Sequence, residues 1–181
     1  LAHDEGKLEE ALALARQVLE LRRTVFGERS VEAATALGAV GLELGTQARY
    51  EESEALLREA TAILREAGGP DDPDLAFYLN ILGQTVYRRG DRAGSIPMFQ
   101  EALAVQRRVL GDVHPDTAGT LNNLAGAYLA TGDLDQAEPL FREALATYLR
   151  LYGEDHAAVP RARGNLARAL RPGGLYVCTT P

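Results

Sequence analysis

The stretch GDVHPDTAGTLNNLAGAYLATGDLDQAEPLFREAL, residues 111–145, contains the pattern from which the fold can be predicted. Its first half carries Leu121, Leu124 and Tyr128 at the three- and four-residue spacing of a helix that buries one stripe of side chains. Its second half repeats this spacing with alanine, leucine and phenylalanine. Gly132 stands between the two halves, where a tight turn is needed. The stretch therefore predicts a helix, a turn and a second helix.

This pattern returns every 42 residues, so the stretch is one copy of a repeated unit. One series of positions opens the first helices and consists of Gly27, Gly69, Gly111 and Gly153. A second series with the same interval opens the second helices and consists of Gly6, Ala48, Gly90 and Gly132. A fixed period of this length is typical of repeat proteins. We expect units at about 27–68, 69–110 and 111–152.

The segments outside these units continue the array in part. Residues 7–25 are expected to form an unaccompanied second helix, and the preceding LAHDEG corresponds to the end of a first helix. A final first helix is expected at 157–171, so the array covers 1–171. The tail, 172–181, contains GGLYVCTTP, whose composition cannot continue a helix. We interpret the tail as a frayed terminus, with a short pairing strand or a segment foreign to the natural protein as the alternatives.

Prolines mark where the helices begin. Pro73 and Pro115 suit the first turn of a helix, because the missing amide hydrogen would have no partner there. Pro97 and Pro139 also lie 42 residues apart and would break a helix interior. They can be accommodated if the second helices begin near residues 93 and 135.

The order and spacing of eight residues in this stretch resembles the tetratricopeptide signature, with leucine in the place usually held by tryptophan. These residues are Leu121, Leu124, Ala125, Tyr128, Gly132, Ala137, Phe141 and Ala144. The usual unit has about 34 residues, and the longer unit here is similar to the repeats of kinesin light chains and similar bacterial proteins. The resemblance implies an all-α, right-handed α–α superhelix of antiparallel helix pairs, with the first helices lining the concave side.

The composition excludes several classes of protein. The chain has 181 residues, 46% of them hydrophobic, a formal net charge of -7 and one cysteine. Nucleic-acid binders usually carry a basic stripe, which this acidic chain does not suggest. No apolar run reaches the roughly 18 to 20 residues that span a bilayer, and the opening residues do not resemble a signal peptide. We expect a soluble, cytoplasmic protein that binds neither nucleic acid nor membrane.

Few residues suggest chemistry. His114 and His156 lie in separate repeats, unlike the closely spaced ligands of a metal site, and helix capping is the preferred interpretation. The sequence has no phosphate-binding loop or nucleophile motif. The acidic loop GDLDQAE lacks the ligand spacing of a calcium loop and, like GPDDPD, suits a turn and a helix cap. We expect no metal, no cofactor and no enzyme activity.

The concave faces of the first helices are the candidate binding surface. An extended peptide presents backbone amides, which asparagine can meet with donor and acceptor at once, and arginine binds carboxylates bidentately. The first unit offers only Thr35, Gly38 and Leu42. The candidate groove residues are Phe77, Asn80, Gln84, Tyr87, Arg88, Asn122, Asn123, Arg161, Asn165 and Arg168.

The family resemblance adds roles for two of these residues. In peptide-binding members, the asparagine before the second signature leucine contacts the ligand backbone, and Asn123 and Asn165 match that position. Ile81 and Ala39 occupy it in the other units, so half of the series departs from the pattern. The alternative for Asn123 is a bond to a neighbouring helix or to a buried water.

Two functions follow from this sequence. The first is a non-enzymatic scaffold that binds a protein or peptide partner, either an extended segment or a helix, in the groove. The alternative is a structural spacer or end-to-end self-association module of a larger multidomain signalling protein, because the apolar side of helix 7–25 would be exposed.

Overall fold

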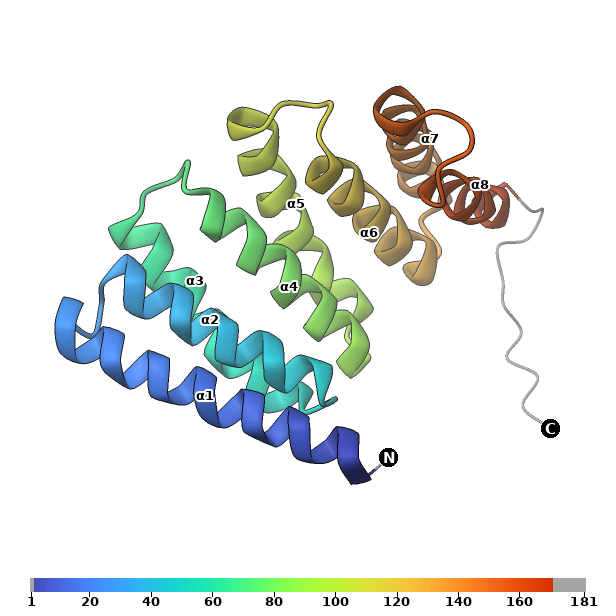
Figure 1. Ribbon diagram of the computed structural model, residues 1–181. Coiled ribbons are helices and arrows are strands. Elements are labelled where there is room, and N and C mark those ends of the chain that lie inside the picture. Colours follow the sequence, from blue (N-terminus) through green and yellow to red (C-terminus); the bar gives the residue numbers. More distant parts are fainter. Residues whose placement is uncertain (1, 171–181) are drawn as a thin grey trace. The chain divides into compact units, whose positions relative to one another are not determined.

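The computed structural model describes residues 2–170, without the side chains of residues 2–5 and 7, and this part of the chain contains eight α-helices (Figure 1). They are α1 (Ala2–Phe26), α2 (Val31–Thr46), α3 (Tyr50–Ala67), α4 (Pro73–Arg89), α5 (Arg92–Val109), α6 (Pro115–Thr131), α7 (Leu134–Tyr152) and α8 (Ala158–Ala169). The second helices α5 and α7 begin at Arg92 and Leu134, which confirms the starts expected from the two internal prolines.

Differences from the sequence-based bounds occur at both ends. The helix expected at 7–25 is α1, which begins at Ala2, so residues 2–6 belong to it rather than to the end of a preceding first helix. Gly6 costs this helix only about 1 kcal/mol relative to alanine, and the alanine, glutamate and leucine residues around it are strong helix formers. The final helix expected at 157–171 is α8. Residue 171 and the expected tail, 172–181, lie outside the described residues.

The first helices begin at capping residues with the period of the sequence. Ser30 Oγ accepts a hydrogen bond from the N–H of Ala33 at 3.1 Å, and Asp72 Oδ1 accepts one from the N–H of Asp74 at 2.8 Å. The next residue in this series is His114, whose Nδ1 accepts the N–H of Asp116 at 3.2 Å. Each bond satisfies an amide that has no partner within its helix. The capping interpretation of His114 is therefore confirmed.

The turns inside the units use left-handed backbone. Gly90 and Gly132 end α4 and α6 with φ of 110° and 86°, as the sequence predicts. Ala48 stands at the same place in the unit before them and is the non-glycine residue with positive φ, 59°, in the described part of the chain. A side chain makes this conformation less favourable.

The two helices of a unit approach closely where a small residue faces a large one. Gly41 lies beneath Leu57, and Gly83 lies beneath the ring of Phe99, which is almost completely buried. Alanines at the fixed interval, Ala60, Ala102 and Ala144, have no exposed surface. Small buried side chains thus recur at the repeat interval in the second helices.

The chain forms two compact units, 1–105 and 106–181, each considered by itself. The boundary falls inside α5 and therefore inside the sequence unit expected at 69–110. In unit 1 each helix from α2 to α4 packs on the helix before it, and Figure 1 shows α2 running back along α1. In unit 2, α7 packs against both α6 and α8.

Arginine–glutamate pairs connect successive second helices at the repeat interval. Arg23 of α1 lies 3.7 Å from Glu59 of α3, and Arg65 of α3 lies 2.8 Å from Glu101 of α5. In unit 2, Arg107 pairs with Glu143. We call these three pairs the ion-pair series. An exposed pair contributes only about 0.2–1 kcal/mol, so the series favours one register between helices more than it adds stability.

Candidate functional site

In unit 1, the predicted groove residues lie together on one face of α4. Phe77, Asn80, Gln84, Tyr87 and Arg88 follow the helical spacing that aligns side chains along one side. We call this surface the α4 face. Phe77 is 45% exposed, although it is a large apolar side chain, and its ring meets the ring of Tyr78 edge-on with centroids 5.1 Å apart.

Polar and cationic groups continue the α4 face beyond Phe77. The Nε2 amide of Gln84 donates to Asn80 Oδ1 at 3.4 Å, so the two side chains are held side by side. The guanidinium of Arg92, from the start of α5, lies 6.0 Å from the centre of the Tyr87 ring. Arg88 is exposed at the end of the helix. The face thus combines an apolar ring, amides and positive charge.

The first unit contributes less to this surface than the sequence suggested. Gly38 of α2, expected to line the groove, is buried beneath the ring of Tyr78, whose Cε1 would lie 2.4 Å from a Cβ added there. The Tyr78 hydroxyl donates to the Thr35 carbonyl oxygen at 2.7 Å, and Arg22 Nη1 donates to Thr35 Oγ1 at 2.8 Å. Burial raises the pKa of Tyr78 above its ordinary value. Gly38 therefore serves packing between α2 and α4.

In unit 2, the predicted residues lie on α6 and α8. Asn122 and Asn123 are half-buried, and a Cβ added to Gly126, one turn further along α6, would meet nothing within 4 Å. On α8, Arg161, Asn165 and Arg168 follow helical spacing, with both arginines exposed. We call these five side chains, with Gly126, the α6–α8 face.

A hydrogen bond joins the two helices of this face. The Nδ2 amide of Asn165 donates to Asn122 Oδ1 at 2.8 Å. Asn165, which the family resemblance assigned to a ligand backbone, is therefore engaged with the neighbouring helix. This bond uses the Asn122 oxygen and the Asn165 amide nitrogen, and the Asn122 amide nitrogen and the Asn165 oxygen take no part in it.

The hydroxyl of Tyr148, on α7, lies near the cationic side of this face. Burial raises the pKa of Tyr148, and the nearby charge of Arg161 acts in the opposite direction. Arg163 pairs instead with Glu154, in the loop before α8. The arginines of α8 thus divide between loop anchoring and the α6–α8 face.

Several contacts around these faces were not anticipated from the sequence. The packing of Tyr78 on Gly38 and the position of Arg92 beside Tyr87 depend on how helices pack against one another. The spacing of residues in the sequence does not predict these contacts. The ion-pair series could have been found, because its arginines and glutamates each recur at 42-residue intervals.

The described side chains include no cluster of three His, Cys, Asp or Glu that could hold a metal ion. Within residues 2–170, the helices do not combine the length and apolar character required to cross a membrane.

Within residues 2–170, eight helices repeat at a 42-residue interval, and consecutive helices pack together from α1 to α4 in unit 1 and from α6 to α8 in unit 2. This arrangement defines an all-α protein of helix-pair repeats. The tetratricopeptide repeat model matches residues 1–66, 44–108, 78–150 and 116–174. The chain belongs to the tetratricopeptide repeat family. The expected fold class, an all-α tetratricopeptide solenoid of helix pairs, is confirmed.

Solved structures agree with this assignment. A candidate kinesin light chain with nearly identical TPR-like repeats from Podosopora anserina superimposes with a TM-score of 0.78 and 20% identity, over 92% of this chain and 79% of that one. Its Q17M form gives a TM-score of 0.79 with 20% identity, covering 92% of this chain and 78% of the other.

BtubC (BKLC) from P. vanneervenii gives a TM-score of 0.82 and 21% identity, over 92% of this chain and 66% of that one. This chain therefore spans slightly less than two thirds of BtubC. At these identities the likeness concerns the fold, and it confirms the predicted similarity to kinesin light chain repeats. The comparison with curated protein sequences gives no match.

Proposed function

We propose that the chain is a protein-interaction scaffold that holds an extended peptide or a partner helix against its first helices. Repeats of this family generally mediate protein–protein interactions, and the family is one of repeat scaffolds rather than catalysts. The finer proposal is that the α4 face and the α6–α8 face are the contact surfaces. A cytoplasmic location is part of the same proposal.

The observation that carries this proposal is the character of the α4 face. An exposed phenylalanine is a suitable anchor for a partner, because aromatic side chains and arginine dominate the energetics of interfaces. The amides of Asn80 and Gln84 follow Phe77 along the α4 face, and amides can bond to a peptide backbone. The exposed Arg88 can bind an acidic group of a partner.

The α6–α8 face supports the same function with different chemistry. The bond between Asn165 and Asn122 fixes two amides on rigid helices, so less conformational freedom is lost when a ligand binds. Asn123 lies beside this pair, and the exposed Arg161 and Arg168 provide positive charge. Backbone amides and carboxylates of a partner are the groups that such a surface recognises.

An affinity capture experiment tests the proposal. The wild-type chain and the Asn123→Ala, Arg168→Ala double variant are used to capture proteins from a lysate, and partners lost with the variant are identified. The affinity of one such partner is then measured for Asn123→Ala alone. We expect about a tenfold loss, the effect of removing one hydrogen bond to a peptide.

The matched control removes the same kinds of side chain from α7. The Gln136→Ala, Arg142→Ala variant deletes an exposed amide and an exposed arginine outside both faces. It should retain every partner and unfold at the same urea concentration as the wild type. Unchanged affinity of Asn123→Ala for the identified partner would refute the role of the α6–α8 face.

A second candidate function, self-association as part of a larger signalling protein or structural spacer, is supported by α1. Leu14, Val18, Leu21 and Val25 lie on one side of this helix with exposed fractions between 45% and 64%. Leu12 and Leu19, on the other side, are buried against the rest of unit 1. An apolar stripe of this kind is typical of a surface that another chain or segment covers.

Sedimentation velocity over a range of concentrations distinguishes the two candidates. Self-association through α1 predicts a sedimentation coefficient that rises with concentration and loses this dependence in the Val18→Glu, Leu21→Glu variant. A monomer at high concentration contradicts self-association but leaves the scaffold proposal intact, because neither the α4 face nor the α6–α8 face includes a residue of α1.

A further inference from the structure

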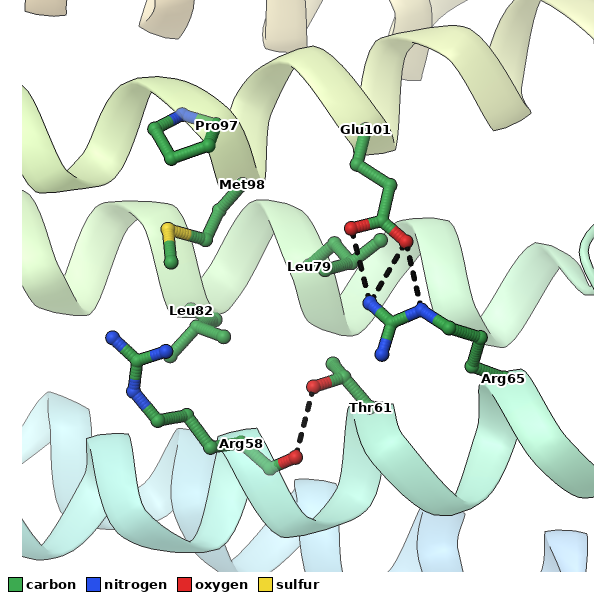
Figure 2. Close-up of a pocket in the computed structure, with 8 residues that line it drawn as sticks. All are labelled: Arg58, Thr61, Arg65, Leu79, Leu82, Pro97, Met98 and Glu101. Carbon is green, nitrogen blue, oxygen red and sulfur yellow. Dashed lines mark hydrogen bonds and ion pairs between the residues drawn. The ribbon is translucent and has the colours of Figure 1, made fainter.

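A hollow of about 180 Å³ lies in unit 1 on the side of α4 opposite the α4 face. Its floor is formed by Leu79 and Leu82, which stand about 200° around the helix from Phe77 and Gln84 because each residue advances about 100°. Thr61 of α3 and Met98 of α5 form its walls (Figure 2). The hollow is therefore separate from the surfaces of the proposed function.

Thr61 is the residue that leaves the hollow open. Leucine occupies the matching position in the neighbouring second helices, as Leu19 in α1 and Leu103 in α5, and both leucines are buried. Thr61 is smaller, and its hydroxyl donates to the carbonyl oxygens of Leu57 and Arg58 at 2.8 and 3.1 Å. The hydroxyl is therefore hydrogen-bonded within its own helix and does not require a polar partner in the hollow.

The size of the hollow fits one apolar side chain. A cavity of about 150 Å³ lined by aliphatic residues holds a benzene molecule. The floor and the Met98 wall are apolar, and methionine adapts to the shape of what it contacts. A side chain of leucine size is therefore well matched to the space.

The two ends of the hollow carry different charge. At one end Arg65 makes three hydrogen bonds of 2.8 to 3.0 Å to the carboxylate of Glu101, so its charge is balanced (Figure 2). At the other end Arg58 is 52% exposed and lies 2.9 Å from Glu54. Arg89 lies 3.0 Å from the same carboxylate, so Glu54 pairs with two guanidinium groups. Arg89 also lies 3.8 Å from Asp91.

We propose that this hollow binds a partner segment that carries a leucine-sized apolar side chain next to a carboxylate. The side chain fills the space that leucine fills in the neighbouring repeats, and the carboxylate meets the exposed guanidinium of Arg58. The exposure of the Arg58 guanidinium supports this partner, because Arg58 is 52% exposed and shares its single carboxylate, Glu54, with Arg89.

The single methionine of the chain makes the hollow directly observable, because Met98 is that residue. The full chain is labelled with ¹³C at the methionine methyl and titrated with N-acetyl-leucine, N-acetyl-leucine amide and N-acetylglycine. We expect the Met98 methyl resonance to shift and saturate with N-acetyl-leucine. Binding should be about tenfold weaker for the amide, which lacks the carboxylate, and N-acetylglycine should leave the resonance unchanged.

Two variants introduce the residues that other repeats of this chain carry at the matching positions. Thr61→Leu fills the hollow as Leu19 and Leu103 do, and should abolish the shift while the chain remains folded by circular dichroism. Arg58→Gln copies Gln100, at the matching position of α5, and should remove the preference for the acid over the amide. Arg16→Gln changes the matching arginine of α1, where leucine already fills the space, and should have no effect.

Three results would overturn the proposal. They are no saturable shift with N-acetyl-leucine, an equal shift in Thr61→Leu, and an equal response to N-acetylglycine. None of these results bears on the α4 face, whose residues are unchanged in all three variants.

Discussion

Gly38→Ala tests the contact that joins α2 to α4. A Cβ built on Gly38 lies 2.4 Å from Cε1 and 2.6 Å from Cδ1 and Cζ of the Tyr78 ring. Ordinary carbon–carbon contacts are about 3.5–4.0 Å, so the ring must move by more than an ångström. Tyr78 is 8% exposed and its hydroxyl is bound to the Thr35 carbonyl, so it has little freedom to do so.

The magnitude follows from three opposing effects. Overpacking in a core costs about 1–3 kcal/mol, and weakening the Tyr78–Thr35 hydrogen bond costs about 1 kcal/mol. Against these costs, alanine stabilises the helix by about 1 kcal/mol relative to glycine, because it is a better helix former. We therefore expect Gly38→Ala to lower the free energy of unfolding by about 2 kcal/mol.

The assay is urea unfolding followed by circular dichroism, with Gly126→Ala as the matched control. Gly126 is also inside a first helix, but a Cβ added there meets nothing within 4 Å. The control should raise the free energy of unfolding by up to about 1 kcal/mol through helix propensity alone. Hydrogen exchange then shows whether the loss in Gly38→Ala is greatest in α2 and α4.

The opposite signs of the two substitutions are the critical result. If Gly38→Ala were as stabilising as Gly126→Ala, the close approach of Tyr78 to the α2 backbone would be wrong. Gly38 would then belong to the groove surface and not to the packing between α2 and α4.

Other substitutions test separate features of the fold. Ala48→Gly should raise the free energy of unfolding by about 1 kcal/mol, because it relieves left-handed backbone at φ 59°, whereas Ala39→Gly in the helix should lower it. The pKa of Tyr78 is raised in the folded state, so neutral Tyr78 contributes its full stabilisation below its pKa in the unfolded chain, about 10. That contribution is lost as pH rises through the pKa of the folded state. Tyr78→Phe should therefore reduce the decline in the free energy of unfolding above about pH 10, measured by urea unfolding at several pH values. A double-mutant cycle of Arg65→Ala and Glu101→Ala should give a coupling of about 0.2–1 kcal/mol that falls with added salt; a value near 3 kcal/mol would contradict an exposed pair. His114→Asp should stabilise the chain by about 0.5 kcal/mol relative to the wild type, and His114→Ala should destabilise it, both measured by urea unfolding.

The sequence predicted the fold well because its signals are local and repeated. Periodic leucines and alanines marked the helices, Gly90 and Gly132 marked the turns, and Pro97 and Pro139 fixed the starts of α5 and α7. The early start of α1 was missed because Gly6 aligns with turn residues elsewhere, and here it continues a helix.

The candidate site was harder to predict, because helical spacing shows which side of a helix a residue occupies but not which residue of another helix it contacts. It placed Phe77, Asn80 and Gln84 on one face of α4, as the structure does. It could not show that Tyr78 covers Gly38, nor that Asn165 bonds to Asn122. Both contacts cross between helices from different units of the repeat, so their partners are set by packing.

The ion-pair series also bears on how such a chain can lengthen. Each internal 42-residue segment carries the glutamate of one ion pair and the arginine of the next, as Glu101 and Arg107 of segment 69–110 illustrate. A tandem duplication of 69–110 would therefore bring its own matching charges to both new junctions. Leu149 stands where the next arginine would be, so growth beyond α7 would lack this complement. Internal duplication is thus the electrostatically matched route to a longer array, and addition after α7 is not.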